Sequence, residues 1–509
     1  MLLTNTTNSL IILVNSLSKA EKRYFRLFSD LQNGEKNYLK LFNLIDENCS
    51  SEILYTKFCR SKSANSYEMA VKHLYRTLLD CLVKLREKQD VQTEICNQIS
   101  KANILFEREM FDEAFHELEK AKKLAITYEN DPLSLLIGRT ELRYLNALDF
   151  KGISEKLLVA KQMKVHEIVK YSKNLNQHLQ LYEILRHRLI YKGFSRSDKQ
   201  KENLNDLVLS ELHLIANSSY QGFEAGKLHL LFQATYYLNS GNYKSAIRQY
   251  QEIILHFEEN KHLIQNPPVH YLNALQGVLE SLQIAGLYDE MPFFLSKLKE
   301  ISEGKYSREF TLSVKAMHYL YEQNRFMQTG DFQSSYILRT EQENFFQKNI
   351  LSLTLEVQLK LLLYSVIHAM YTGDLNLARK HMKKITRSGK IFHTLPSYKT
   401  VRLVNLLLQA ELGNFDFLEN EVTSIKRRLG TDRQMYTIEK LIFCFTSSYP
   451  LPLYEKSKRK LWEQLQTTIR SIKKNKYEFR LIRVFDVISW IEYKLTSKPL
   501  SEILIKKRE

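Results

Sequence analysis

A short glycine turn recurs along this chain at a nearly constant spacing, and the recurrence limits the folds that the chain can adopt. Five copies read Gly241-Asn242-Tyr243, Gly286-Leu287-Tyr288, Gly330-Asp331-Phe332, Gly373-Asp374-Leu375 and Gly413-Asn414-Phe415. Their glycines are 45, 44, 43 and 40 residues apart, and a degenerate copy stands at Glu109-Met110-Phe111. Repetition at this period predicts stacked helical hairpins.

The residues of each turn are those that end one helix and begin the next. Glycine just past a helix end adopts the left-handed conformation without a Cβ clash. Asn or Asp beside it caps the following helix by accepting a hydrogen bond from a free backbone N–H. Apolar residues then recur on one helical face, after Tyr243 as Ala246, Ile247, Tyr250, Ile253, Ile254 and Phe257.

The same periodicity follows other copies of the turn. It gives Ala114, Phe115, Leu118, Ala121 and Ala125 after Phe111, Ala378, Met382 and Ile385 after Leu375, and Leu418, Val422, Ile425 and Leu429 after Phe415. Two further copies are expected between residues 111 and 243. Gly152-Ile153, followed by Leu157, Ala160 and Met163, fits one of them, and Gly193-Phe194 marks the other.

The turn and its stripe resemble the tetratricopeptide repeat. Gly241, Tyr243, Ala246 and Tyr250 match that motif in order, and so do Gly373, Leu375, Ala378 and Met382. The period of 40–45 departs from the usual spacing of about 34, and Met291, Ser335 or Leu418 replaces the small residue in other copies. The resemblance implies an all-α fold, an α-solenoid of stacked antiparallel helical hairpins over residues 95–430.

The composition is typical of a nearly all-helical protein. Other features of the sequence favour a location in the cytoplasm. The chain has 509 residues with only 15 glycines and 8 prolines, and it shows no sustained strand-like alternation. No apolar stretch is long enough for a membrane span, and none resembles a secretory signal. The five cysteines form no Cys-x-x-Cys pair, which favours free thiols in a reducing compartment over disulfides or metal ligands.

The two ends differ from the repeats, which gives three predicted regions: an N-terminal helical domain at 1–90, repeats at 91–450, and capping helices at 451–509. Ser18 and Glu21 form a capping box, and helices are expected over Tyr38–Glu47, Glu52–Cys59 and Tyr67–Glu87. Two segments, Asn15–Phe28 and Lys36–Phe42, resemble the N-terminal region of an uncharacterised helical-repeat family of Bacteroidota-type bacteria. This resemblance implies a bacterial, cytoplasmic setting. After Tyr449-Pro-Leu-Pro452, helices are expected over Tyr454–Lys474 and Tyr477–Leu495.

Positive charge is concentrated at the C-terminal end. The net charge is +17, and residues 421–509 contribute +10 of it. The candidate contacts to an acidic partner, nucleic acid or protein, are Lys456, Lys458, Arg459, Lys460, Lys473, Lys474 and Lys476. The alternative is a solvated outer face that keeps this end soluble. The same alternative applies to a second cluster, Arg379, Lys380, Lys383, Lys384 and Arg387.

Motifs that carry catalysis are missing from the sequence. Gly222–Lys227 lacks the spacing of a phosphate-binding loop, and no Gly-x-Ser-x-Gly turn occurs. His166-Glu167 and His116-Glu117 have Lys where a zinc-protease helix needs its second His. We therefore expect a protein that is not an enzyme and has no catalytic, cofactor or metal residues.

Two functions remain open from the sequence. The first is a non-enzymatic scaffold for protein–protein interaction, with aromatic residues such as Tyr236, Tyr237, Tyr319, Tyr321, Phe345 and Phe346 either lining a peptide groove or filling the core. The second is a nucleic-acid-binding or transcription-regulatory protein. It would use its basic C-terminal end or an N-terminal helix-turn-helix with Arg60, Lys62, Lys72 and Arg76 near phosphates.

Overall fold

The computed structural model describes residues 2–30, 37–47, 51–60, 63–86, 90–192, 195, 198–217, 222–264, 267–395, 397–430, 436–496 and 498–507. Within these ranges every regular element is helical and no strand occurs, which confirms the all-α prediction. The chain divides into two compact units, Met1–Leu175 and Asn176–Glu509. The boundary falls inside one long helix, α9 (Glu155–Lys192). The three-region division expected from the sequence stays a prediction.

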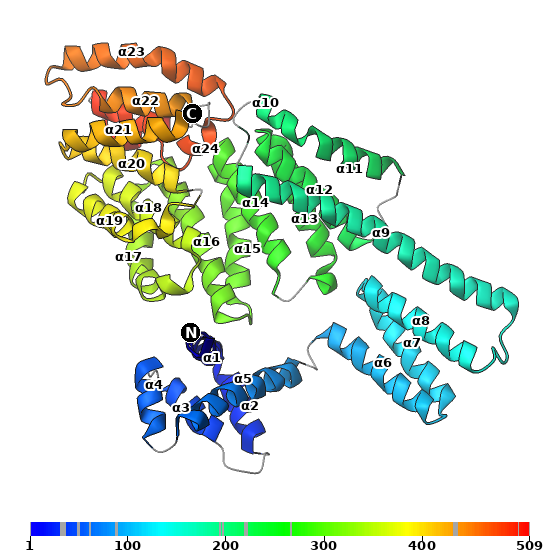
Figure 1. Cartoon of the computed structure of the whole chain (residues 1–509). Helices are drawn as coiled ribbons and strands as arrows, with labels where there is room; N and C mark the ends of the chain where they lie inside the picture. The colour runs from blue at the N-terminus through cyan, green and yellow to red at the C-terminus, as the bar shows by residue number, and fades with distance from the viewer. Residues whose placement is uncertain are drawn as a thin grey trace. The chain divides into compact units, whose positions relative to one another are not determined.

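The first unit begins with a small helical cluster around a central helix. Its helices are α1 (Leu2–Ser16), α2 (Lys19–Asp30), α3 (Asn37–Asp46), α4 (Ser51–Cys59) and α5 (Ala64–Arg86). The other four pack against α5, and their shared core includes Leu10, Phe42 and Leu74 (Figure 1). The predicted capping box is confirmed, because Ser18 N donates to Glu21 Oε2 at 2.8 Å and Glu21 N donates to Ser18 Oγ at 3.2 Å.

A hairpin and a third helix follow in the same unit: α6 (Val91–Glu107), α7 (Phe111–Thr127) and α8 (Asp131–Ala147). Glu109 takes the left-handed conformation at the α6–α7 turn, with φ of 61°. Of the predicted face of α7, Ala114, Leu118, Ala121 and Ala125 are buried, and Phe115 is partly buried. Because three of the buried residues are alanines, α6 and α7 approach each other closely.

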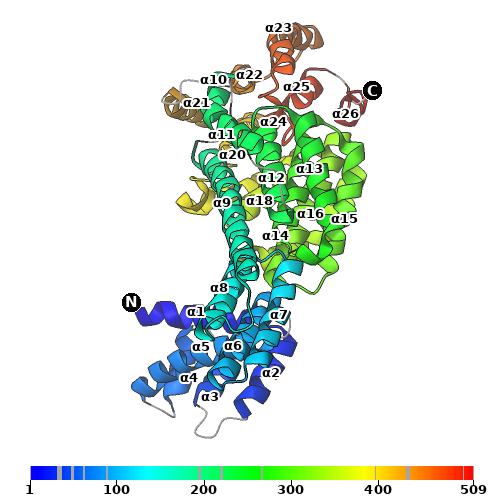
Figure 2. The same cartoon turned by 90° about the vertical axis from the view of Figure 1, so that its right-hand side faces the viewer.

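The copy expected at Gly152 forms a turn but does not form a buried hairpin. Gly152 has φ of +76°, as predicted. The expected apolar face is not buried, since Leu157 is 44% and Met163 59% exposed. Figure 2 shows α9 as one continuous helix, because no glycine or proline interrupts residues 155–192. The turn expected at Gly193-Phe194 lies outside the described residues.

The second unit contains the five predicted hairpins. They are α12 (Phe223–Asn239) with α13 (Tyr243–Glu259), α14 (Val269–Ala285) with α15 (Met291–Glu303), α16 (Arg308–Thr329) with α17 (Phe332–Asn349), α18 (Leu355–Tyr371) with α19 (Leu375–Arg387), and α20 (Tyr398–Glu411) with α21 (Phe415–Gly430). All five turn glycines are left-handed, with φ between +74° and +81°. This result confirms the predicted role of glycine.

Side-chain caps begin three of the second helices. Asn242 Oδ1 accepts from Ser245 N at 3.5 Å, Asp331 Oδ1 from Ser334 N at 3.0 Å, and Asp374 Oδ1 from Leu377 N at 2.9 Å. All six predicted residues on the apolar face of α13 are buried. The predicted face of α19, Ala378, Met382 and Ile385, is buried as well.

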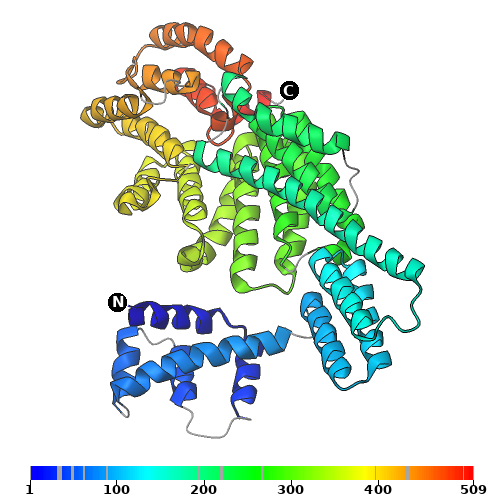
Figure 3. The same cartoon turned by 45° about the vertical axis from the view of Figure 1, so that its right-hand side comes forward.

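The hairpins pack in sequence order. Each first helix packs against its own second helix and against the first helix of the next hairpin, from α12 through α14, α16 and α18 to α20. Figure 2 labels α12 to α16 standing side by side, and Figure 3 shows the same group of green helices from another side. The short elements of this unit are α10 (Asp198–Lys201), η1 (Glu202–Leu204), α11 (Asn205–Asn217), η2 (Lys261–Leu263), η3 (Tyr288–Glu290), η4 (Ile350–Ser352) and η5 (Gly389–Phe392).

The C-terminal helices are α22 (Thr437–Thr446), α23 (Glu455–Lys474), α24 (Phe479–Ile482), α25 (Val487–Leu495) and α26 (Leu500–Lys506). The single helix expected over Tyr477–Leu495 is therefore wrong, because it is two helices. The buried carboxylate of Asp486 separates them by capping α25, accepting from Ser489 N at 3.1 Å. Glu478, also buried, contacts a helix distant in sequence, since it accepts from Thr437 N at 2.7 Å and Ile438 N at 3.1 Å in the first turn of α22.

Residues 475–507, which we call the C-terminal strap, cross the turns of the first three hairpins. A Cβ on Gly241 would lie 3.0 Å from the Lys476 side chain, one on Gly286 2.5 Å from Arg483, and one on Gly330 3.0 Å from the backbone oxygen of Ser501. Tyr243 Oη donates to Lys476 O at 2.9 Å. Gln283 and Asn324 both donate to Arg483 O, at 3.2 and 3.0 Å.

The strap shares one hydrophobic core with the third, fourth and fifth hairpins. Trp490 is 1% exposed, and its ring lies 6.1 Å from that of Tyr371 on α18 and 6.1 Å from that of Phe485. The backbone N–H of Asp486 donates to Tyr371 Oη at 2.9 Å. The last described residues are fixed too, because Lys507 forms an ion pair with the buried Asp486. Burial acts to raise the pKa of Asp486, but Lys507 and the Ser489 hydrogen bonds outweigh it, and the pKa is lowered.

Candidate functional site

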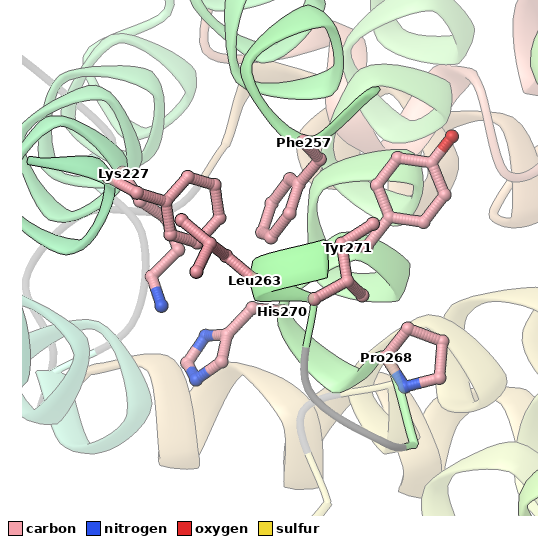
Figure 4. A pocket seen from close by; sticks show the side chains of 8 residues that line it. Lys227, Phe257, Leu263, Pro268, His270 and Tyr271 are labelled. Carbon is pink, nitrogen blue, oxygen red and sulfur yellow. The ribbon is translucent and has the colours of Figure 1, made fainter. Parts of the chain in front are cut away.

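A small hollow lies between α12, α13 and α14 (Figure 4). Phe223, Lys227, Phe257, Leu263, Ile264, Pro268, His270 and Tyr271 line it. Its free volume is about 10 Å³, which holds a single water molecule. The hollow is therefore too small to hold a substrate.

A buried ion pair holds the lysine of this hollow. Lys227 is only 2% exposed, and its Nζ lies 2.6 and 2.7 Å from the two carboxylate oxygens of Glu224. The same ammonium lies 5.5 Å from the ring centre of Phe223. Burial, together with the charge of Lys227, lowers the pKa of His270. The arrangement is an internal ion pair with a neutral histidine beside it.

A second polar cluster is buried between α17, α18 and α19. His368 and His381 are both buried, and neither ring makes a hydrogen bond within the part of the chain that the structure describes. Burial, reinforced by the Arg339 guanidinium, lowers the pKa of His368 to about 4. Burial and the charge of Lys384 lower the pKa of His381. Both rings are therefore neutral at pH 7.

No metal centre was found in the described ranges, where no group of three or more His, Cys, Asp or Glu side chains is placed to hold an ion. Those ranges also contain no helix with the length and apolar character that a membrane span requires.

The C-terminal candidate contacts fall into two groups, one near the start of α23 and one at its end and just beyond it. Lys456, Arg459 and Lys460 are exposed near its start, and Lys458 is half-buried. Cations in this position oppose the helix dipole, which favours negative charge at the N-terminus. Arg459 lies 3.9 Å from the carboxylate of Glu463, and both side chains are well exposed. This exposed pair contributes little stability.

The remaining candidates have structural partners. Lys473 and Lys474 lie in the last turn of α23, where the helix dipole favours cations. Lys476 lies 3.5 Å from Asp198 and 5.0 Å from the ring centre of Tyr477, and its stem covers Gly241. Packing explains Lys476 without a partner molecule. The role of the seven residues in binding an acidic partner stays a prediction.

The N-terminal residues proposed for a helix-turn-helix do not form a purely cationic face. Arg60 is exposed, and Lys62 lies outside the described residues. Lys72 and Arg76 are exposed on the side of α5 opposite the core, and Met69, Leu79 and Val83 share that side. A face that mixes large apolar side chains with cations differs from the polar surface by which a recognition helix contacts base edges.

Two of the proposed groove aromatics are core residues. Tyr319 and Phe346 are buried, with ring centres 5.0 Å apart, so the groove interpretation is wrong for this pair. Tyr321 is partly buried, and its Oη donates to Gln276 O at 3.3 Å. Phe345 of α17, another of the proposed groove residues, is 36% exposed, and Phe293 of α15, which was not among them, is 61% exposed. Spacing alone did not separate the buried aromatics from the exposed ones.

The comparisons with known proteins give no name to these surfaces. No protein-family model matches the chain, and no curated protein matches it. Function is therefore argued from the geometry alone.

Proposed function

We propose that this protein is a non-enzymatic interaction scaffold whose second unit is an α-solenoid of tetratricopeptide-like hairpins. The supporting observation is the regular succession of α12 to α21: each hairpin turns at a left-handed glycine, and each first helix packs on the next. Such stacking gives a long continuous surface that suits an extended peptide or a partner helix. The resemblance of the N-terminal segments supports a bacterial, cytoplasmic setting as part of this proposal.

The exposed apolar side chains of the second helices provide contacts for a protein partner. Leu255 on α13, Phe293 on α15 and Tyr336 on α17 are each at least half exposed. Lys297 Nζ lies 4.7 Å from the ring centre of Phe293 and leaves most of the ring uncovered. Rigid aromatic side chains of this kind act as anchors in protein interfaces. The partner expected from these contacts is a protein or peptide with apolar side chains of its own.

The test is partner capture followed by reconstitution. Tagged protein is used to isolate partners from source-cell extract, and the captured protein is then purified and titrated against the scaffold. We expect Phe293→Ser with Tyr336→Ser to weaken binding at least about tenfold, as loss of an anchor does. Leu351→Ser, at an exposed leucine of η4, is the matched control and should bind normally. Equal binding by both variants would contradict the proposal, and so would a small molecule copurifying in place of any protein.

A further inference from the structure

The outer face of α19 is a strip of positive charge. Its members, the α19 cationic strip, are Arg379, Lys380, Lys383, Lys384 and Arg387. All five are exposed, whereas Ala378, Met382 and Ile385 on the opposite side are buried. The eight steps from residue 379 to residue 387 give the strip a length of roughly 12 Å. Figure 1 draws α19 at the edge of the second unit, with α18 between it and α16.

Within the described ranges, no carboxylate is paired with this strip. The sequence of α19 contains no Asp or Glu. Among the residues that the structure describes, none of the five cations forms an ion pair, although such pairs occur on neighbouring helices, as between Arg325 and Glu322 at 2.8 Å. Glu343 on α17 is already engaged by Arg339, at 3.2 Å. The strip therefore faces solvent with its full charge.

Ordinary solvation does not account for the arrangement. The cations are neighbours at three and four positions apart, where like charges destabilise a helix by about 0.2–0.5 kcal/mol per pair. The helix dipole favours only Lys384 and Arg387, which lie in the last turn. The corresponding helix of the first hairpin, α13, carries charges of both signs, since Lys244 and Arg248 are followed by Glu252. A row of like charges works against the stability of its own helix, and exceptions of this kind are expected at functional sites.

An acidic protein and a nucleic acid are the two kinds of anionic partner to distinguish, and the residue types of the strip favour one of them. Lysine is depleted at protein–protein interfaces, which rely on aromatic and apolar anchors, and none of the five members of the strip is apolar. Nucleic-acid interfaces are strongly positive and bind mainly through phosphates. A strip of roughly 12 Å runs alongside about seven phosphates of a duplex, both strands counted, which is enough for its five cations. We propose that the α19 cationic strip binds the phosphate backbone of nucleic acid, without reading its sequence.

This inference goes beyond the proposed scaffold, since it gives the second unit a second kind of partner, bound by α19 and not by the apolar side chains of α13, α15 and α17. Full-length protein is titrated with a labelled 20-base-pair DNA duplex at several salt concentrations. If all five cations contact phosphates, the logarithm of the binding constant should fall with the logarithm of salt with a slope of about −4.5. The variant Arg379→Gln, Lys383→Gln, Arg387→Gln should reduce the slope to about −2, since it removes three contacts.

Two controls make the outcome decisive. The variant Lys244→Gln, Arg248→Gln, Lys299→Gln removes the same charge from exposed positions on α13 and α15, and it should keep the wild-type slope. The variant Arg379→Lys, Arg387→Lys keeps the charge and should bind normally. Polyglutamate of matched charge should compete poorly. The proposal is overturned if the wild-type protein does not bind the duplex at 50 mM salt. It is also overturned if the two triple variants lose the same DNA affinity, or if polyglutamate competes as well as unlabelled DNA.

Discussion

The turn glycines Gly241, Gly286 and Gly330 lie beneath the C-terminal strap, whereas Gly373 and Gly413 face open space. All five have nearly the same φ, so the backbone requirement for glycine is the same at each. The first three carry a second requirement, because a side chain there would meet the strap. The two groups of turns share one sequence motif, but only the turns of the first group are covered by the C-terminal strap.

The comparison shows that the strap is a structural part of the second unit. Its backbone carbonyl at Arg483 accepts hydrogen bonds from two different hairpins, through Gln283 of α14 and Asn324 of α16. Arg483 Nε donates back to Ile284 O at 3.3 Å, and its guanidinium lies 5.8 Å from the ring centre of Tyr288. The strap therefore links neighbouring hairpins that otherwise contact each other only through their helices.

The largest effect is expected from removing the main apolar anchor of the strap. Trp490→Ala deletes a side chain that is almost completely buried against Tyr371 and Phe485. We expect the free energy of unfolding of the second unit to fall by about 3–5 kcal/mol, as for other buried Trp-to-Ala changes. Urea unfolding followed by far-UV circular dichroism measures the change.

The control for this substitution is Trp462→Ala, which removes the half-buried tryptophan of α23 outside the strap. Its effect should be clearly smaller, because less apolar surface is lost. Equal losses for the two tryptophans would mean that the strap is not a principal source of stability.

The next prediction compares a covered turn with an open one. Gly286→Ala and Gly373→Ala impose the same left-handed strain, worth about 1–2 kcal/mol. The new Cβ at position 286 would also displace the Arg483 guanidinium, 2.5 Å away, whereas position 373 has nothing within 4 Å. We expect unfolding free energies to fall by about 2–3 kcal/mol for Gly286→Ala and about 1 kcal/mol for Gly373→Ala.

A double-mutant cycle sharpens the comparison. In an Arg483→Ala background the extra loss at Gly286 should largely disappear, because the group that the Cβ displaces is gone. If Gly286→Ala remains as costly in that background, the difference between the two turns does not come from the strap.

The sequence predicted the hairpins because their signals are local. The turn glycines, the caps at Asn242, Asp331 and Asp374, and the apolar faces all act within one helical hairpin. The strap has no such signal. Its contacts join Lys476 to Tyr243 and Arg483 to Gln283, across more than 190 residues, and no period of the sequence encodes them. For the same reason, the sequence predicts a single helix over Tyr477–Leu495 and misses the break at Asp486.

The candidate surfaces were only partly predictable. The sequence identified the cations of α19 and α23, because charge is read directly. It did not show that Lys476 is used in packing, since that role depends on the distant Gly241 and Asp198. The aromatic residues were the least predictable, because Tyr319 and Phe293 have similar local patterns but opposite exposures.

A third prediction concerns acid stability in the hairpin with an open turn at Gly373. His368 has its pKa lowered to about 4 in the folded state, whereas an unfolded histidine titrates near 6.5. Between these values the unfolded chain binds more protons, so the stability contributed by neutral His368 is full above pH 6.5 and is lost as pH falls toward 4. We expect a loss of about 2 kcal/mol between pH 7.5 and pH 5 from this residue.

The measurement is urea unfolding at the two pH values. His368→Gln cannot titrate, so the difference between pH 7.5 and pH 5 should shrink by about 2 kcal/mol even if the variant is less stable at both. His116→Gln, at an exposed histidine of α7, should leave the difference unchanged. An unchanged difference in His368→Gln would show that other groups govern the acid response.

The smallest effect separates the caps of the two kinds of turn. Asp374 Oδ1 accepts a hydrogen bond of 2.9 Å from Leu377 N at the open turn, whereas Asn242 Oδ1 accepts one of 3.5 Å from Ser245 N beneath the strap. Asp374→Ala should therefore lower the unfolding free energy by about 1 kcal/mol, and Asn242→Ala by only a few tenths. Asp374→Ser keeps a capping oxygen and should recover most of the loss. A larger loss for Asn242→Ala would mean that the strap depends on this cap, and that the covered turns are the less robust group.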